Sequence, residues 1–462
     1  MSDYPKEECG VVGISANVDA SRLAFFALYA IQHRGQESAG LATYNEKIHI
    51  KTGMGLISQA LEEADIETLH GSFSIGHTRY STTGSTRIEN AQPISCMVDN
   101  TEIALSHNGN VINAKQIRDE LEEWGCKFKT SSDSEVILQL LANAPGKEWK
   151  EKITYMMSRL QGAYSLTVLT DSGVLGIRDP LGVRPLCLGK IDSGYILASE
   201  SCSIDHIGGE YIRELDPGEA VLITKNEYKT IYKKETGKIA ACVFENIYFA
   251  RPDSILDDQL VYLTRKKMGA QLAIEHPVDA DLVIGVPDSA TAAAVGYSEE
   301  SGITFTEGLV KNRYVGRTFI LPNQKLRDLG VRRKLNPLKE IIYGKSIIVV
   351  DDSIVRGTTT PFVVDLLRKA GAKTIHLRIC APPIKWPCHF GVDMATKNEL
   401  LAANKSIEDI QNFVKADSLG YLSIEGLMKS VSKPKNKYCD ACFTGKYPIP
   451  VQLEMNKFAL ES

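Results

Sequence analysis

The sequence has little cysteine and no long apolar run. Ten cysteines in 462 residues are too few for a disulfide scaffold in a chain of this length. No apolar stretch approaches the roughly 18 residues that a transmembrane helix needs. The first eight residues, MSDYPKEE, are polar and acidic, unlike a secretory signal or a transit peptide. These absences predict a cytoplasmic protein with reduced cysteines, of which any special ones serve catalysis or metal binding.

The sequence also lacks a strong excess of either charge. Its formal net charge is -4, which argues against a chain built for non-specific nucleic-acid binding. It has no internal repeat and no low-complexity segment, which excludes solenoids and propellers. Hydrophobic residues make up 43% and charged residues 24%, as in ordinary globular proteins. The length of the chain predicts two or three domains.

Residues 9 to about 235 are predicted to form short strands with helices between them. Strands are expected at 9–14, 40–44, 74–81, 103–109, 163–170, 174–179 and 194–200. A helix is expected over 21–34, with Gly35 ending it and with one apolar face made of Leu23, Phe26, Ala27, Ala30 and Ile31. A second is expected over 114–124, stopped by Gly125. This order indicates a layered α+β domain.

After about residue 235 the pattern changes to continuous apolar strands alternating with helices. The runs 281–287 and 345–352 are uninterrupted by polar residues until their ends, and helices are expected over 257–275 and 360–370. Strands of this kind are covered on both faces, so a parallel α/β sheet is predicted. The segment 313–343 is rich in Arg, Lys, Gly and Pro, which is typical of a functional or mobile loop. Mixed helix and turn is expected over 405–462.

Cys9 opens the first predicted strand, in the run CGVVGI. Taken alone, it is best explained as a small buried core residue. Three further segments favour a functional site: Arg34 to Ser38 after the first helix, His77 to Thr82 at a strand end, and His107 to Asn110 at another. Polar residues and glycines gathered at strand ends are where a scaffold presents a site.

Together these four segments resemble the class II glutamine amidotransferases, which have the N-terminal-nucleophile αββα fold, over about 9–235. The resemblance implies that residues 1–8 are a propeptide and that the mature chain begins at Cys9. It also implies that Asn108 and Gly109 form an oxyanion hole, and that Arg79 and Asp133 bind the glutamine carboxylate and amino group. The alternative for Asp133 is a helix N-cap, and both roles are compatible. His77 and His107 are interpreted as core histidines.

The stretch from Val349 to Thr359 places two carboxylates directly after buried aliphatics and before a loop rich in Gly, Ser and Thr. Such a loop at a helix N-terminus binds phosphate, and paired aspartates hold ribose hydroxyls or hydrated Mg²⁺. The alternative, a solvated turn with a helix cap, does not explain why two acids follow four buried aliphatics.

This stretch resembles the motif of type I phosphoribosyltransferases that binds 5-phosphoribosyl-1-diphosphate (PRPP), which implies a parallel α/β domain over 236–462. By this resemblance Asp351 and Asp352 contact ribose and Mg²⁺, and Ser289 lies near the metal in the pyrophosphate loop. The phosphate loop would contain Ser353, Arg356, Gly357, Thr358 and Thr359. The basic segment with Arg313, Arg317, Arg332, Arg333 and Lys334 is similar to the family's flexible lid, although a charged run is usually just a solvated loop.

Four cysteines remain as metal-ligand candidates: Cys242, Cys388, Cys439 and Cys442. The last two have the C-x-x-C spacing of a chelating turn, and four thiolates suit either zinc or an iron–sulfur cluster. The other cysteines lie in or beside apolar runs and are interpreted as packing: Cys96, Cys126, Cys187, Cys202 and Cys380.

The order of the two motif sets resembles the amidophosphoribosyltransferase family, in its iron–sulfur-containing branch. The resemblance implies a [4Fe–4S] cluster on the four cysteines, Mg²⁺, glutamine and PRPP as substrates, feedback by purine nucleotides, and a homotetramer or homodimer. It implies no nucleic-acid or membrane partner. The rivals are another class II amidotransferase, such as a glucosamine-6-phosphate or asparagine synthase, and a regulatory nucleotide-binding protein with a dead glutaminase. The 349–359 run fits neither synthase, and every matched glutaminase position is intact.

Overall fold

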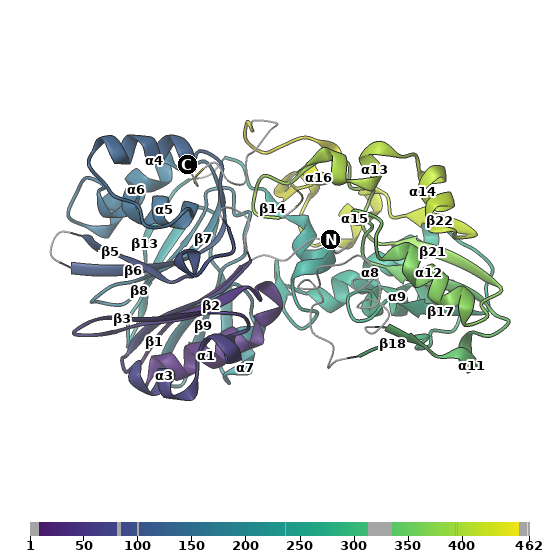
Figure 1. The fold of residues 1–462 in the computed structure, drawn as a ribbon, viewed down its shortest axis with the longest axis horizontal. Helices are drawn as coiled ribbons and strands as arrows, with labels where there is room; N and C mark the ends of the chain where they lie inside the picture. The colour runs from purple at the N-terminus through teal and green to yellow at the C-terminus, as the bar shows by residue number, and fades with distance from the viewer. Residues whose placement is uncertain are drawn as a thin grey trace.

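The computed structural model describes residues 9–80, 85–98, 101–235, 237–312, 335–392, 394, 396–451 and 460. Three groups of predicted residues lie outside this part of the chain: the propeptide 1–8, the end of the His77 to Thr82 segment (Ser81 and Thr82), and the basic residues Arg313, Arg317, Arg332, Arg333 and Lys334. The described chain forms two halves, one with two stacked sheets and one with a single parallel sheet (Figure 1).

The first half contains two antiparallel sheets. One has the order β11-β9-β10-β1-β4-β2-β3 and the other β13-β12-β8-β7-β6-β5. The strands of the first sheet are β1 (Gly10–Ala16), β2 (Ser38–Asn45), β3 (Lys47–Met54), β4 (Phe73–Arg79), β9 (Cys187–Ile191), β10 (Gly194–Ala198) and β11 (Glu210–Glu214). Those of the second are β5 (Ile94–Val98), β6 (Thr101–Val111), β7 (Gly162–Leu169), β8 (Val174–Arg178), β12 (Glu219–Ile223) and β13 (Tyr228–Lys233).

Helices cover the outer faces of both sheets. The helices on the first sheet's side are α1 (Ala20–Ala30), α2 (Ile57–Ala60), α3 (Glu63–Thr68) and α7 (Cys202–His206), and those on the second are α4 (Ala114–Glu123), α5 (Asp133–Ala142) and α6 (Trp149–Arg159) (Figure 1). A separate core joins the inner faces, with Val11 and Leu197 from one sheet packed with Leu169 and Val221 from the other. The predicted αββα layering is confirmed.

The first helix differs from the prediction at its end and on its face. α1 stops at Ala30, and a short 3₁₀ turn, η1 (Gln32–Arg34), follows before an extended Gly35. Phe26, expected in the core, is 48% exposed, whereas Leu28 is fully buried. The rest of the predicted face is confirmed, because Ala27, Ala30 and Ile31 are buried and Leu23 packs against the core. The buried face also includes Ala24 and Leu28.

The second half is built on a parallel sheet of order β17-β20-β21-β22. Its strands are β17 (Leu282–Gly285), β20 (Ser346–Asp351), β21 (Thr374–Ile379) and β22 (Ser418–Tyr421), and all three pairings are parallel. Its helices are α8 (Val261–Glu275), α9 (Thr291–Ser301), α11 (Lys339–Ile342), α12 (Thr360–Lys369), α13 (Leu401–Asn404), α14 (Ile407–Val414), α15 (Ile424–Ser430) and α16 (Ala441–Thr444). The predicted parallel α/β fold is confirmed.

Short elements complete the fold. They are η2 (Ile88–Asn90), the π-helical turn η3 (Glu245–Phe249), η4 (Lys397–Glu399), η5 (Lys435–Lys437) and the strand pairs β14 (Ala241–Cys242) with β23 (Tyr438–Cys439), β15 (Ile255–Leu256) with β16 (Gln259–Leu260), and β18 (Leu309–Lys311) with β19 (Leu335–Pro337). Helix α8 begins four residues later than predicted, because Asp257 and Asp258 take left-handed φ values of 53° and 59° in the turn before β16.

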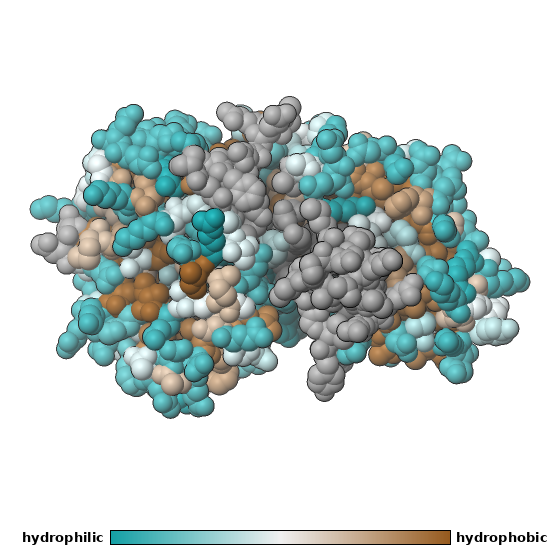
Figure 2. Space-filling view, viewed as in Figure 1, coloured by the Kyte–Doolittle hydropathy of each residue, from teal (hydrophilic) through white to brown (hydrophobic). Residues whose placement is uncertain are grey.

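In the part of the face that Figure 2 colours by hydropathy, polar residues are widespread and apolar residues gather in small separate groups. Within the described ranges, no helix is long and apolar enough to cross a membrane.

Candidate functional site

Cys9 lies immediately before β1 and is 7% exposed. Its Sγ is 3.3 Å from the carbonyl oxygen of Tyr80, and the Tyr80 N–H points at the sulfur from 3.4 Å. Burial raises the pKa of the Cys9 thiol to about 11, although the Tyr80 backbone and Arg79 oppose this shift. The thiol is therefore protonated at neutral pH and needs a base before it can act as a nucleophile.

Arg79 and Asp133 converge on Cys9 from different elements. Arg79 ends β4 and is 2% exposed, and Asp133 begins α5 and is 3% exposed. Both charges act on the Cys9 thiol, so the three side chains share one buried region. The helix-cap alternative for Asp133 is wrong, because Ser132 is the N-cap and accepts from the Ser134 N–H at 3.2 Å. Asp133 Oδ2 instead accepts the N–H of Val111 at 3.0 Å.

Asn108 and Gly109 lie on β6, which the contact between Val111 and Asp133 fixes beside this region. The Asn108 side chain is 1% exposed, and neither of its polar atoms has a hydrogen-bond partner among the residues that the structure describes. A buried amide without a partner is costly, so this group is available to a ligand. Gly109 has a φ of 146°, and a Cβ there would meet the Ala163 carbonyl oxygen at 2.0 Å, so only glycine fits.

The two histidines of these motifs are buried, as expected. His77 Nε2 bonds the His107 carbonyl at 3.0 Å, and His107 Nδ1 lies 3.1 Å from Ser134 Oγ. Burial lowers the pKa of His77 to about 3, so the ring is neutral. Each is only half satisfied, because His77 Nδ1 and His107 Nε2 lack partners among the described residues.

The paired carboxylates lie at the carboxyl end of β20. Asp351 is 3% and Asp352 1% exposed. Asp352 accepts from the hydroxyls of Ser289 and Ser353, at 2.5 and 2.6 Å. Burial raises the pKa of Asp352 to about 6 against these hydrogen bonds and the nearby Arg265. The structure thus brings Ser289, from the turn after β17, to the acidic pair, as the sequence predicted. A buried acidic pair with two hydroxyls is a donor set that Mg²⁺ accepts.

The loop after the acidic pair leads into α12. Gly357 has a φ of 71°, a left-handed conformation that favours glycine, and Thr359 is the N-cap of the helix. The Arg356 guanidinium bonds Glu399 Oε2 through Nε at 3.0 Å and Nη2 at 2.6 Å. Thr358 and Thr359 directly precede the ten-residue helix α12. The free N–H groups at the N-terminus of such a helix favour binding of an anion such as phosphate.

The four candidate cysteines line one cavity. Cys242 and Cys439 are register partners in the β14 and β23 pair, and Cys388 and Cys442 face the same space. Burial raises the pKa of Cys442 well above its usual range, and the nearby thiols of Cys439, Cys242 and Cys388 add to this shift. Among the described residues, no three His, Cys, Asp or Glu side chains approach closely enough to hold a single ion. The remaining cysteines are buried or pack against the core, as predicted: Cys96, Cys126, Cys187, Cys202 and Cys380.

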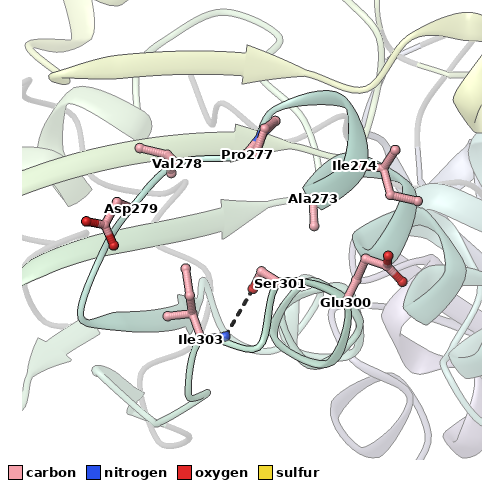
Figure 3. Close-up of a pocket in the computed structure, with 8 residues that line it drawn as sticks. All are labelled: Ala273, Ile274, Pro277, Val278, Asp279, Glu300, Ser301 and Ile303. Carbon is pink, nitrogen blue, oxygen red and sulfur yellow. Dashed lines mark hydrogen bonds between the residues drawn. The ribbon is translucent and has the colours of Figure 1, made fainter.

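A separate pocket lies between the C-terminal ends of α8 and α9 (Figure 3). Its volume is about 460 Å³, and its lining includes Asp279 and Glu300 at its margins. Two carboxylates without a cation in the lining disfavour a phosphorylated ligand. Its lining includes neither residue of the acidic pair and shares no residue with the cysteine cavity, so it is a separate pocket.

Sequence reasoning missed a buried ion-pair group next to Cys9. Arg34 lies between Glu200 and Glu245, with N–O distances of 2.7 and 2.8 Å. Arg34 stood in a quoted motif, but Glu245 belongs to no motif, and no local signal could have found it.

Comparison with known proteins agrees with this geometry. The profile of the glutamine amidotransferase domain matches residues 77–206. The amidophosphoribosyltransferase of Archaeoglobus fulgidus is 49% identical over 449 residues, which cover 96% of this chain and 98% of that protein. The Synechocystis amidophosphoribosyltransferase is 47% identical and covers 100% and 95%. The chain belongs to the amidophosphoribosyltransferase family. This family carries out the first step of purine biosynthesis.

Solved structures match over almost the whole chain as well. The glutamine PRPP amidotransferase of B. subtilis, in complex with ADP and GMP, has a TM-score of 0.91 and 41% identity and covers 98% of this chain and 100% of its own. A second, described as the allosteric regulatory enzyme of purine biosynthesis, has a TM-score of 0.92 and 41% identity, with coverage of 98% and 99%. The predicted family is thereby confirmed, together with its two-part fold.

Proposed function

We propose that the enzyme converts glutamine, PRPP and water to 5-phosphoribosylamine, glutamate and pyrophosphate, with Cys9 as the N-terminal nucleophile. The observation that carries the proposal is the buried amide of Asn108, which has no hydrogen-bond partner in the described part of the chain and lies on the strand that Asp133 ties to the Cys9 region. A binding site with an unsatisfied donor beside a nucleophile is what acyl transfer requires.

In the glutaminase step the Cys9 sulfur attacks the side-chain carbonyl of glutamine, the C–N bond breaks to release ammonia, and water then hydrolyses the thioester to glutamate and the free thiol. Because burial keeps the thiol protonated, a base is needed, and a free α-amino group with a pKa of about 7.7–8.0 can serve. The Asn108 amide and the Gly109 N–H then stabilise the oxyanion. Arg79 binds the glutamine carboxylate and Asp133 the amino group, in accord with their charges.

The mature chain is proposed to begin at Cys9, after removal of the propeptide 1–8. The reason is chemical, because the Cys9 nitrogen is an amide and not a base while Glu8 is attached. Intact-mass analysis of active enzyme is expected to show loss of Met1 to Glu8. Cys9→Ala is expected to keep the leader, because removal is autocatalytic. Fully active enzyme that retains Met1 would rule out this mechanism.

In the synthetic step Asp351, Asp352 and Ser289 are proposed to hold Mg²⁺ and the ribose of PRPP. The metal would neutralise charge on the pyrophosphate leaving group. The loop with Ser353, Arg356, Gly357, Thr358 and Thr359 would bind the 5′-phosphate. Since Glu399 engages the Arg356 side chain, we assign the Arg356 contact to its backbone. Ammonia must reach PRPP without being protonated in water, so a channel from Cys9 to the acidic pair is part of the proposal.

The cysteine cavity is proposed to hold a structural [4Fe–4S] cluster. Four cysteines line it, and burial together with the neighbouring thiols raises the pKa of Cys442, so a metal centre would be needed to hold these cysteines as thiolates. A single zinc ion needs sulfurs about 2.3 Å from the metal, whereas a cubane spans more widely separated ligands. Four cysteines suit zinc or a cluster equally, and the resemblance to the iron–sulfur-containing branch favours the cluster.

Anaerobically purified enzyme is expected to be brown and to contain about four iron and four sulfide per chain. Cys439→Ser with Cys442→Ser should abolish the colour and the iron content. The matched control is Cys187→Ser, which changes a buried cysteine of the first half whose Sγ lies 3.2 Å from the Ala198 carbonyl. Colourless active enzyme with one zinc, or without metal, would contradict the proposal.

Several broader assignments complete the proposal. The domain division is 9–235 for the glutaminase and 236–462 for the phosphoribosyltransferase with its cysteine-containing tail. ADP and GMP bound to the B. subtilis relative support feedback by purine nucleotides here. A cytoplasmic location and a homotetramer or homodimer are proposed from the sequence.

The test of function is PRPP-dependent formation of glutamate by the purified protein. We expect glutamate release to rise on addition of PRPP and Mg²⁺, with phosphoribosylamine as the second product. Assays of glucosamine and asparagine synthesis serve as controls. Either of these activities, or glutamate release indifferent to PRPP, would favour a rival amidotransferase.

A further inference from the structure

The Arg34 side chain holds the backbone of Cys9. Arg34 is 1% exposed, and its Nε donates to the Cys9 carbonyl oxygen at 3.1 Å. Its Nη1 donates to Glu200 Oε1 at 2.7 Å, and its Nη2 donates to Glu245 Oε1 at 2.8 Å. Glu200 and Glu245 thus orient the Arg34 guanidinium, and its Nε–H holds the carbonyl of Cys9 in place.

Glu200 is a rigid anchor of this group within the first half. It is 1% exposed and also accepts from His33 at 2.7 Å, from the Ser254 hydroxyl at 2.7 Å and from the Arg251 N–H at 2.8 Å. Burial by itself would raise the pKa of Glu200, but His33 and Arg34 hold it well below its usual range. Glu200 is therefore charged and fixed.

Glu245 comes from the second half and contacts two buried arginines. Besides Arg34, it lies 3.6 Å from Arg184 Nη1. Arg184 in turn donates to the Phe390 carbonyl, two residues after Cys388. Glu245 thus contacts both Arg34, which bonds the Cys9 carbonyl, and Arg184, which bonds the Phe390 carbonyl in the wall of the cysteine cavity.

Glu245 belongs to the turn η3, whose other end lies beside the PRPP site. Burial raises the pKa of Tyr248 above its usual range, and so do the charges of Asp352 and Asp351. Arg265 of α8 donates to the carbonyls of Asn246 and Ala250, at 3.0 and 2.7 Å. These two hydrogen bonds tie the turn that carries Glu245 to α8 of the phosphoribosyltransferase half.

We propose that Glu245 is a positioning residue for glutamine hydrolysis, acting from the phosphoribosyltransferase half through Arg34 on the backbone of Cys9. The proposal rests on Cys9 being the nucleophile, as proposed above. Glu245 touches no reacting atom, and its role is to keep the Arg34 fork aligned. Without the Glu245 charge, the positive charges of Arg34 and Arg184 lose the carboxylate that both contact. The Arg34 side chain is then less firmly oriented, and its Nε is no longer held on the Cys9 carbonyl.

Glu245→Gln is expected to lower kcat for glutamine by about 10–100-fold, because a nucleophile displaced by about 1 Å loses on the order of 10²-fold in rate. KM for glutamine should change by less than about threefold, since Arg79 and Asp133 are untouched. The rate of Cys9 alkylation by iodoacetamide, followed against pH, should fall over the whole range or shift its midpoint. The matched control is Glu219→Gln, a buried carboxylate paired with Arg213 on β11 and β12.

A double-mutant cycle with Arg34→Lys separates positioning from general destabilisation. Lysine keeps the charge but cannot bond both carboxylates and the Cys9 carbonyl at once. If Glu245 acts through Arg34, the double variant should be no slower than the slower single variant. Thermal midpoints of all variants establish that they are folded, and Glu245→Asp replaces Glu245→Gln if that variant fails to fold.

Unchanged kcat and an unchanged alkylation profile in a folded Glu245 variant would overturn the proposal, as would multiplicative effects in the cycle. Cys9→Ala distinguishes the two levels of inference. Normal glutamine use by Cys9→Ala would refute the proposed function. An inactive Cys9→Ala beside a normal Glu245→Gln would refute the positioning role alone.

Discussion

Cys9→Ala is expected to lose glutamine-dependent synthesis by more than about 10⁴-fold, as loss of a nucleophile does in other acyl-transfer enzymes. Synthesis from a high concentration of ammonium should persist near the level of the unaltered enzyme. The reason is that the acidic pair and its loop lie in the second half, on β20 and α12, whereas Cys9 begins the first half. Both rates are measured with the same PRPP concentration.

The matched control for this experiment is Cys187→Ser, which changes another buried cysteine of the glutaminase half. It should leave both glutamine-dependent and ammonia-dependent synthesis close to their original rates. If Cys9→Ala also ends ammonia-dependent synthesis in a folded protein, then the assignment of the two half-reactions to separate sites is wrong.

Asp351→Asn combined with Asp352→Asn is expected to remove synthesis from both glutamine and ammonia, by more than about 10³-fold. Neutral amides cannot replace two carboxylates as ligands of Mg²⁺ or hold the ribose hydroxyls with the same charge. Binding of PRPP, measured by calorimetry with Mg²⁺, should be lost in parallel. The control is Asp365→Asn, which changes an α12 carboxylate that pairs on the surface with Lys369.

The same pair of substitutions should not destabilise the fold. Burial raises the folded-state pKa of Asp352 to about 6, above its usual 3.8, so the fold favours the protonated carboxyl. Its favourable contribution is complete below pH 3.8 and is lost as the pH rises through about 6. At neutral pH the charged Asp352 therefore opposes folding, and the double variant should have an equal or higher thermal midpoint. A large fall in the midpoint would contradict this account and would leave the activity loss without a local explanation.

Contiguous motifs and periodic patterns account for what could be predicted. β20 was recognised because four aliphatic residues precede two aspartates, and the strand, predicted over 345–352, spans Ser346–Asp351. Ser289 was placed near the pair by resemblance, and its hydroxyl bonds Asp352. The glutaminase residues were found in the same way, since Asn108 and Gly109 are adjacent in the chain. In each case short segments carry the information, and the resemblance to known families is what relates one segment to another.

Helix faces were predicted less well. The sequence around α1 has apolar residues on more than one face, so periodicity alone could not decide between Phe26 and Leu28. Leu23, Ala27, Ala30 and Ile31 pack inward as predicted, whereas Phe26 is 48% exposed and Leu28 takes its place in the core. Gly35 was an obvious stop signal, yet α1 ended earlier because a 3₁₀ turn, η1, follows Ala30.

Local spacing and composition in the sequence determined a layered α+β half, a parallel α/β half and the acidic phosphate motif, whereas the αββα fold and the role of Cys9 as nucleophile came from resemblance to known families. Only the tertiary structure decided which distant groups meet. Arg34 and Glu245 are 211 positions apart, and the four cysteines of the cavity come from three separate segments. Pairings of this kind arise when buried charges and thiols must find partners in a packed interior, and no pattern along the chain records which partner they find.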